Sequence, residues 1–454
     1  MRAAVIGAGP SGFYASDQLL RAGFEVDLLD ALPTPFGLVR AGVAPDHPKI
    51  KSVTRVYDKT AQHPGFRFFG GVGVGVDVAR DELLERYHAV VYAIGTATDN
   101  RLGIAGEELH GVHAATDFVG WYNGHPAYAD RAFDLGVERA VVIGNGNVAI
   151  DVARMLMLTA EEVASTDTAD HAIAALARSR VREVVLLGRR GPAQAAFTNP
   201  ELLELGELAR ADVVVDPAGV VLDAVSAAWL ASDEADKTAR RNVTILQEYA
   251  ARTRSDRSHR VVLRFLRSPV EVLGDGAGRV TGLRVAVNRI EAGKDGRLRA
   301  VDTGSREVIP CGLVLRSIGY RGEPLPGVPF DERRGLISNV DGRVVDAAGE
   351  PHPGEYAVGW IKRGPSGVIG TNKKCAADTV ARILEDREAG RLHAPVPGGR
   401  EETEGWLRER VPNLVTWAGW AAIDAHETAA GRPHGRPRVK LVRVREMLAV
   451  AAGR

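Results

Sequence analysis

The chain has 454 residues, of which 45% are hydrophobic and 26% charged, a composition typical of a folded protein with several domains. Its 58 basic residues equal its 58 acidic residues, so no overall charge favours a nucleic acid or an anionic membrane. The two cysteines, Cys311 and Cys375, lie far apart and lack the spacing of a dithiol or metal-cluster site, which argues against thiol redox catalysis and metal binding.

The first thirty residues predict a strand, a helix and a second strand. An apolar run at 3–6 leads into a glycine-rich turn, and apolar residues within 13–20 can share one helical face. Residues 24–28 then alternate as a strand does, so a parallel sheet begins here. A chain that starts with a strand, and has no apolar run of about 18 residues, predicts neither a cleavable leader nor a membrane span. We therefore expect a cytoplasmic protein.

The turn after the first strand follows the dinucleotide-binding pattern GxGxxG. Its residues are Gly7, Ala8, Gly9, Pro10, Ser11 and Gly12. Glycines let the backbone approach a pyrophosphate, and Asp30 ends the second strand, where an acid accepts hydrogen bonds from an adenosine ribose. A glycine turn without a ligand is the alternative, but strand, glycines, helix, strand and acid together favour a dinucleotide site.

Residues 88–95 predict a further apolar strand that ends at a glycine. Similar strands at 313–319 and 356–359 come late in the chain, and we expect both to return to the first sheet. The first domain is then interrupted by an inserted one. The predicted division is 1–104 for the first part of the first domain, 105–325 for the inserted domain, and 326–454 for the second part with a C-terminal extension.

A second strand, glycine turn and helix begin at Ala140. The turn and the start of the helix read Gly144, Asn145, Gly146, Asn147, Val148 and Ala149, with alanine in the place of the third glycine. A helical insertion at 163–180 precedes the next strand, 183–187, which leads to Arg189 and Arg190 instead of an acid. Two guanidiniums there favour the 2′-phosphate that distinguishes NADP from NAD, although a solvated basic turn is the alternative.

Two dinucleotide sites in one chain imply electron transfer between two dinucleotides. An N-terminal site with a ribose acid, completed by strands late in the chain, is the arrangement of FAD-binding flavoproteins of the disulfide-reductase type, with the NADPH domain inserted. Since the chain has no CxxC motif, the dithiol members of that group are excluded.

Four long segments closely resemble adrenodoxin reductase and its bacterial relatives, the FprA-type ferredoxin–NADP reductases. They occupy residues 32–49, 144–151, 188–198 and 359–372, and the match continues in order over nearly the whole chain. The resemblance implies an α/β fold with two Rossmann-like nucleotide-binding domains, the NADP domain inserted in the FAD domain. It also implies the reaction: a hydride passes from NADPH to FAD, and single electrons then pass to a ferredoxin that feeds a cytochrome P450 or another oxygenase.

The resemblance also implies roles for individual residues. Beside the first glycine turn, the residues expected at FAD are Ser11, Asp30, Leu38, Val74, Trp360, Gly367, Val368 and Ile369. Beside the second turn, with 144–148 at the pyrophosphate, those expected at NADP are Arg101, Arg189, Arg190, Glu201 and Gly367. His47 and Asp151 match a pair near the flavin implicated in proton or electron transfer; without the resemblance, a loop residue and a helix brace are the simpler interpretation.

The partner implied by the resemblance is a ferredoxin. Lys237, Arg240 and Arg241 lie in a segment of helical character and are candidates for docking an acidic ferredoxin, although most such clusters are only solvated. The resemblance suggests a monomer, with no nucleic-acid or membrane partner. Two alternatives remain: the electron-donating subunit of a glutamate synthase-like complex, whose N-terminal cysteine cluster this chain lacks, and a regulatory module that binds FAD and NADP without turnover.

Overall fold

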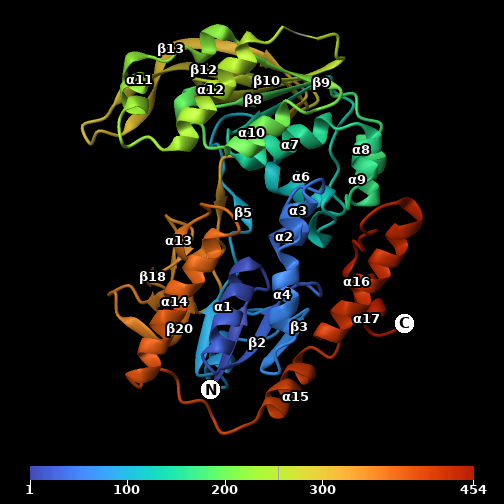
Figure 1. The fold of residues 1–454 in the computed structure, drawn as a ribbon, viewed down its shortest axis with the longest axis vertical. Coiled ribbons are helices and arrows are strands. Elements are labelled where there is room, and N and C mark those ends of the chain that lie inside the picture. Colours follow the sequence, from blue (N-terminus) through green and yellow to red (C-terminus); the bar gives the residue numbers. More distant parts are fainter. Residues whose placement is uncertain (254) are drawn as a thin grey trace. The chain divides into compact units, whose positions relative to one another are not determined.

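The computed structural model describes residues 1–253 and 255–454 (Figure 1). The chain forms two compact units. The first unit consists of Met1–Thr98, Asn123–Ala129 and Gly319–Arg454, and the second unit of Asp99–Tyr122 and Asp130–Ile318. The first unit thus draws on both ends of the chain. Among the described residues, no helix is both long and apolar enough to cross a membrane.

A seven-stranded sheet forms the centre of the first unit. Its order is β18-β19-β20-β4-β1-β2-β3, and the five strands from β20 to β3 are parallel. The strands are β1 (Arg2–Ile6), β2 (Glu25–Asp30), β3 (Phe66–Gly70), β4 (Ala89–Tyr92), β18 (Asn339–Val340), β19 (Arg343–Val345) and β20 (Pro351–Ala357). The pairing of β20 with β4 confirms that the strand expected near Tyr356 returns to the first sheet.

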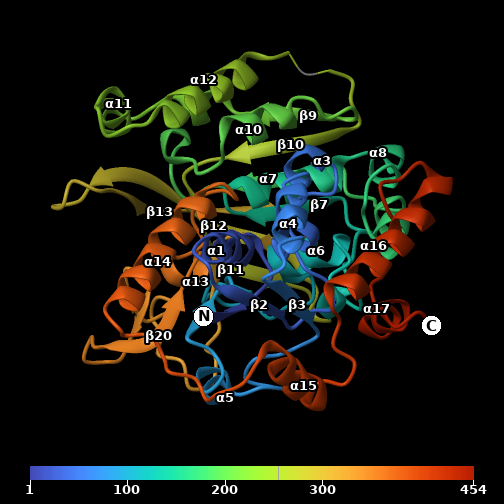
Figure 2. The same ribbon diagram turned by 60° about the horizontal axis from the view of Figure 1, so that its bottom comes forward.

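Hydrophobic clusters and helices cover both faces of this sheet. Ala3 and Val5 of β1 belong to the cluster that contains Phe13, whereas Ala4 and Ile6 belong to the cluster on the other face. Helices α1 (Pro10–Arg21) and α14 (Thr371–Glu388) pack side by side (Figures 1 and 2). The other helices are α2 (Leu38–Ala41), α3 (Pro48–Lys51), α4 (Thr54–Ala61), α5 (Arg80–Leu84), α13 (Trp360–Arg363), α15 (Arg400–Arg410), α16 (Trp417–Gly431) and α17 (Val444–Ala451).

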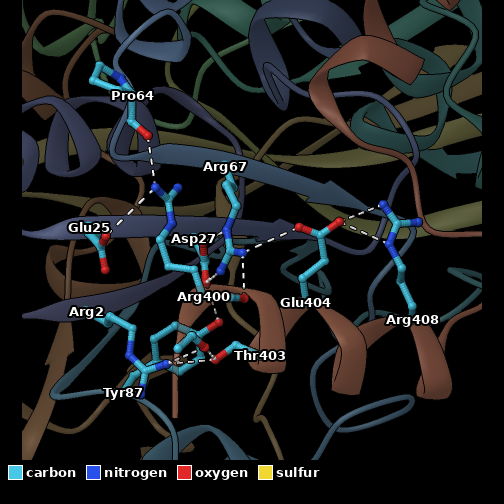
Figure 3. Close-up of polar contacts among 11 residues, drawn as sticks. Arg2, Glu25, Asp27, Pro64, Arg67, Tyr87, Arg400, Thr403, Glu404 and Arg408 are labelled. Carbon is cyan, nitrogen blue, oxygen red and sulfur yellow. Dashed lines mark hydrogen bonds and ion pairs between the residues drawn. The ribbon is translucent and has the colours of Figure 1, made fainter.

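Polar contacts fasten α15 to the first sheet (Figure 3). Asp27 of β2 and Arg67 of β3 are register partners, and two hydrogen bonds of 2.7 Å join their side chains. The buried Tyr87 hydroxyl donates to the same carboxylate at 2.8 Å, and Arg67 also donates to the carbonyl oxygen of Arg400 at 2.7 Å. These contacts lie in the amino-terminal part of β2, whereas Asp30 is its last residue.

A six-stranded parallel sheet forms the centre of the second unit, in the order β6-β14-β7-β8-β10-β9. Its strands are β6 (Val112–Ala114), β7 (Arg139–Ile143), β8 (Glu183–Leu187), β9 (Ala211–Val215), β10 (His259–Arg264) and β14 (Leu313–Arg316). A three-stranded antiparallel sheet consists of β11 (Arg267–Gly274), β12 (Val280–Ala292) and β13 (Leu298–Pro310).

The helices of the second unit lie between its strands along the chain. They are α6 (Ala115–Tyr122), α7 (Asn147–Met157), α8 (Ala160–Ala164), α9 (Asp170–Leu176), α10 (Asn199–Leu205), α11 (Ala224–Ala231) and α12 (Lys237–Ala251). Because α8 and α9 lie between α7 and β8, the expectation of helical structure in this insertion is confirmed.

The strand at 313–319 does not return to the first sheet, so that prediction is wrong. Strand β14 pairs with β7 and β6 in the second unit. It is the counterpart of β4, because each lies beside the strand that precedes a glycine turn and each is followed by a glycine, Gly95 or Gly319. Since both sheets use the same pattern at the same place, an apolar run with a final glycine does not reveal which sheet it joins.

Candidate functional site

The first glycine turn is closed on two sides and open on a third. Gly7 has a φ of +104°, and a Cβ there would lie 2.6 Å from the carbonyl oxygen of Ala93, after β4. A Cβ on Gly12 would lie 2.0 Å from the carbonyl oxygen of Gly7, so only glycine lets α1 pack this closely on the strand. A Cβ on Gly9 would meet nothing within 4 Å. Gly9 precedes α1, whose N-terminal amides favour an anion at this open side.

Asp30 ends β2 beside this turn. Its carboxylate accepts hydrogen bonds from the amides of Ala8, at 2.7 Å, and Leu32, at 2.8 Å. Burial raises the pKa of Asp30 to about 6, although the two amides act in the opposite direction. An ionised carboxylate has acceptor capacity beyond two bonds, so Asp30 can also accept from a ribose hydroxyl.

Residues 36–38 pack against the turn at Ala8 and Gly9, on a side other than the open one. The Phe36 amide donates to the Ala8 carbonyl oxygen at 2.8 Å, and a Cβ on Gly37 would lie 2.9 Å from the Cα of Gly9. Leu38, which begins α2, leaves 45% of its surface exposed. The sequence predicts Leu38 at this site but not the contact of Gly37 with Gly9, for which a glycine at this position is the only signal.

A segment near the C-terminal end of the chain packs against the same turn at Gly359. A Cβ on Gly359 would lie 2.1 Å from the hydroxyl oxygen of Ser11, which brings the segment after β20 against the start of α1. The next residue, Trp360, lies with its ring centroid 5.5 Å from that of Tyr320. Within the described part of the chain, the buried indole N–H of Trp360 finds no hydrogen-bond acceptor. An unsatisfied buried donor of this kind fits a site that a cofactor completes.

Three further residues expected at FAD lie in loops of the first unit. Val74 is buried in the loop after β3, whose Val72 amide donates to the Asp30 carbonyl oxygen at 2.8 Å. Gly367 has a φ of +80°, and a Cβ there would lie 2.5 Å from the Thr371 hydroxyl oxygen, so glycine is required. Gly367 and Val368 are exposed before α14, and Val368 leaves 57% of its surface exposed.

The second glycine turn repeats the geometry of the first. A Cβ on Gly144 would lie 2.1 Å from the carbonyl oxygen of Ser317, after β14, while a Cβ on Gly146 would meet nothing within 4 Å. The side chain of Asn147 accepts from the Thr198 amide at 2.8 Å, and the Thr198 hydroxyl donates to Glu201 at 3.0 Å. Glu201 is thereby tied to the turn through Thr198, a link that the sequence did not indicate.

Arg189 and Arg190 follow β8 in the loop beside this turn. Their carbonyl oxygens are fixed by the Asn288 side chain, at 2.8 Å, and by the Leu266 amide, at 3.1 Å. Arg189 is exposed and Arg190 half-buried, and neither guanidinium forms an ion pair with any described carboxylate. Burial and then the charge of Arg189 hold the pKa of Arg190 below its usual value. Two cations without counter-charges favour an anionic group here.

The remaining expected NADP contact, Arg101, is engaged within the second unit. It forms an ion pair with Glu108 and a second, of 3.5 Å, with Glu107. Its role at the nucleotide stays a prediction.

His47 and Asp151 belong to different units, and their pairing stays a prediction. His47 is buried and directly precedes α3 in the first unit. Asp151 lies in α7 of the second unit, 3.6 Å from the guanidinium of Arg154.

The three docking candidates lie in the first turns of α12, and two of them make contacts of their own. Arg240 donates to the carbonyl oxygens of Leu230, at 3.0 Å, and Ser232, at 2.7 Å. Arg241 pairs with Glu248 at 3.1 Å. Lys237 is exposed at the start of the helix.

Comparison with known proteins gives matches along the whole chain. The family model described as pyridine nucleotide-disulphide oxidoreductase matches residues 1–186. The NADPH-ferredoxin reductase FprA of Mycobacterium leprae is 49% identical over 464 residues, covering 99% of this chain and 98% of that protein. The mitochondrial NADPH:adrenodoxin oxidoreductase of Arabidopsis thaliana is 41% identical, covering 99% and 95%. The structure of Mycobacterium tuberculosis FprA in complex with NADPH aligns with a TM-score of 0.93 at 49% identity, covering 100% of this chain and 99% of that one.

Proposed function

This chain belongs to the family of the FprA-type NADPH-ferredoxin reductases, and on that basis we propose that it is a ferredoxin–NADP reductase with FAD in the first unit and NADPH in the second. The observation that carries the proposal is the pair of matching glycine turns. Only the second turn has, after the neighbouring strand, two arginines without ion-pair partners among the described residues. The first has an acid there, Asp30.

The residues of the first unit fit FAD. The open side of the turn at Gly9 admits a pyrophosphate, Asp30 offers acceptors to the ribose, and the unsatisfied indole N–H of Trp360 offers a donor. Bound FAD supplies the conversion of a two-electron donor into single electrons. The chain contributes the binding and orientation: Gly359, directly before Trp360, lies against Ser11, and Gly367 and Val368 are exposed.

The residues of the second unit fit NADPH. Gly146, where a Cβ would meet no atom within 4 Å, directly precedes α7, and the N-terminal end of this helix favours the pyrophosphate. Arg189 and Arg190 hold the 2′-phosphate, and Glu201, fixed through Thr198, lies toward the nicotinamide end.

His47 and Asp151 are part of the proposal as a pair that handles a proton near the flavin. If they act as a unit, His47→Gln and Asp151→Asn each lower kcat with little effect on the KM for NADPH, and the double variant loses no more than the worse single variant. Additive losses in the double variant, with the flavin spectrum unchanged, would exclude the pair.

A ferredoxin is the proposed electron acceptor, with Lys237 and Arg241 of α12 among its docking residues. A monomer located in the cytoplasm is also part of the proposal.

Reduction of a ferredoxin by NADPH tests this function directly. We expect the purified protein to be yellow, to release FAD and not FMN on denaturation, and to sustain NADPH-dependent cytochrome c reduction only when a ferredoxin is present. A yellow protein that binds NADPH and sustains no electron flux to any ferredoxin would indicate the regulatory module instead. Activity that required a glutamate synthase partner would indicate an electron-donating subunit of a glutamate synthase-like complex.

A further inference from the structure

The C-terminal part of the chain binds Arg40, two residues after Leu38. Arg40 donates two hydrogen bonds to Glu427 of α16, from Nη1 to Oε2 at 2.8 Å and from Nη2 to Oε1 at 2.6 Å. The side chain of Glu427 is 0% exposed and that of Arg40 is 10% exposed. A paired fork of this kind fixes orientation as well as distance.

Glu427 is held in its ionised form by its surroundings. Its carboxylate also accepts from the Leu441 amide at 2.8 Å and from Arg438 at 3.3 Å. Burial opposes its charge, but attraction to Arg40 and Arg438 outweighs burial and holds the pKa of Glu427 below its usual range. Arg40 therefore faces a permanent buried anion.

The backbone of Arg40 is bound by the same part of the chain. Lys440, which is 5% exposed, donates to the Arg40 carbonyl oxygen at 3.1 Å and to the Asn123 carbonyl oxygen at 3.1 Å. Trp420 of α16 lies with its ring centroid 5.4 Å from the Arg40 guanidinium and 5.5 Å from the Phe36 ring. The C-terminal part of the chain thus contacts both ends of segment 36–40.

Segment 36–40 packs directly against the first glycine turn, next to its open side. Its Phe36 amide bonds to Ala8, and Gly37 contacts Gly9 so closely that a Cβ would not fit. A displacement of Arg40 is therefore transmitted to the place where the proposed pyrophosphate binds.

We propose that Glu427 and Lys440 are positioning residues of the FAD site, which act through Arg40 to hold segment 36–40 against the glycine turn. This inference rests on the proposed function, because it takes the first turn as the FAD site. We call Arg40, Glu427 and Lys440 the C-terminal clamp.

The test uses full-length protein purified with its flavin. The variants are Glu427→Gln, which keeps the shape of the side chain and removes its charge, and Lys440→Met, which removes only the bonds made by Nζ. The control is Asp27→Asn, which breaks another buried acid–arginine pair of the same unit, at the α15 side of the sheet. The readouts are the rate of FAD release, followed by flavin fluorescence on dilution, and the visible circular dichroism of the bound flavin.

We expect Glu427→Gln to speed FAD release about tenfold, as the loss of a charge-assisted hydrogen bond does, and to change the visible circular dichroism. Lys440→Met should speed release severalfold. Asp27→Asn should lower the melting temperature and leave the release rate within about twofold of wild type.

Release rates and flavin spectra like those of wild type in both clamp variants would overturn the inference. So would equal acceleration in the Asp27→Asn control at a matched loss of melting temperature. If Glu427→Gln does not fold, Lys440→Met alone decides in the same way. A wild-type protein that holds no FAD would instead refute the proposed function.

Discussion

At the scale of single residues, Asp30 ends the second strand of the first unit, and Arg189 and Arg190 follow the corresponding strand of the second unit, one and two residues beyond the place that matches Asp30. Asp30 is fixed by two backbone amides, whereas the arginines have only their carbonyl oxygens fixed and their guanidiniums free to reach an anion. We therefore expect the difference in charge at the end of these strands to determine which dinucleotide each unit prefers.

We expect Asp30 to make FAD retention depend on pH. Its pKa of about 6 lies above its ordinary value of 3.8, so the unfolded chain ionises first, and the contribution of Asp30 to stability falls as pH rises from about 4 to 6. FAD binding changes in the opposite direction, because an ionised carboxylate is the better acceptor for the ribose. We expect FAD release to accelerate as pH falls through about 6.

Asp30→Asn is the comparison that isolates this effect. The variant should release FAD faster than wild type at pH 7.5 and show little change in rate between pH 7.5 and 5. Stopped-flow flavin fluorescence measures both profiles, and parallel profiles in the two proteins would assign the pH dependence to another group.

Arg189 and Arg190 should give the enzyme its preference for NADPH over NADH. A phosphate monoester carries roughly −1.5 to −2 charges near pH 7. Two charge-assisted hydrogen bonds to it contribute about 3–6 kcal/mol, and we expect the lower value because Arg189 is exposed to solvent. Replacing both with alanine should lower kcat/KM for NADPH about a hundredfold and leave that for NADH almost unchanged. A double variant that keeps its preference for NADPH would contradict the assignment.

At the scale of elements, the first sheet carries the proposed FAD site after the carboxyl ends of its strands and the α15 contacts in their amino-terminal part. The Asp27–Arg67 pair and Tyr87 hold α15, while Asp30, three residues beyond Asp27 in β2, faces the glycine turn. We therefore expect different parts of the same strand to contribute to stability and to cofactor binding.

Asp27→Asn should separate these two properties. Breaking a buried ion pair from one side costs about 3–5 kcal/mol, and Arg67 keeps its bond to the Arg400 carbonyl oxygen, so we expect about 3 kcal/mol of lost stability. Tyr87→Phe, which removes one neutral donor, should cost about 1 kcal/mol. Chemical denaturation followed by far-ultraviolet circular dichroism gives both values, and an Asp27→Asn loss no larger than that of Tyr87→Phe would show that the pair stabilises little.

At the scale of the whole molecule, the sequence predicted what local patterns encode. The strand, turn and helix around Gly7, Gly9 and Asp30 could be predicted because they lie within thirty residues, and the strand before Arg189 because it is a short apolar run. The sheet that receives 313–319 was not predictable, since β4 and β14 share one pattern. The contact between Arg40 and Glu427 was missed because 387 residues separate them, and no periodicity spans such a distance.

Because the chain has no net charge, a charged partner can be attracted only by a local cluster of charges. The basic residues of α12 form one such candidate cluster. Arg240 donates two hydrogen bonds to carbonyl oxygens at the end of α11, so reversing its charge would also break these bonds. Lys237→Glu combined with Arg241→Glu reverses charge with less effect on structure, because only the Arg241–Glu248 ion pair is lost. The double variant should slow ferredoxin reduction at low salt and make its rate less dependent on ionic strength. The reason is that salt screens charges separated by more than a Debye length, which is about 8–10 Å at physiological salt. Ferricyanide reduction by NADPH is the control. If both rates match wild type, the ferredoxin docks elsewhere.

The position of β20 beside β4 has a consequence for synthesis of the protein. On the ribosome, β4 is complete at Tyr92, but its neighbour begins only at Pro351, after residues 93–350 have been translated. At roughly 5–20 residues per second, the buried edge of β4 waits about 13–50 seconds for its partner. All strands of the six-stranded sheet of the second unit, the last of which ends at Arg316, are translated during that interval. The nascent chain therefore finishes the unit that begins second before the unit that begins first, and its apolar β4 edge needs protection from aggregation until then.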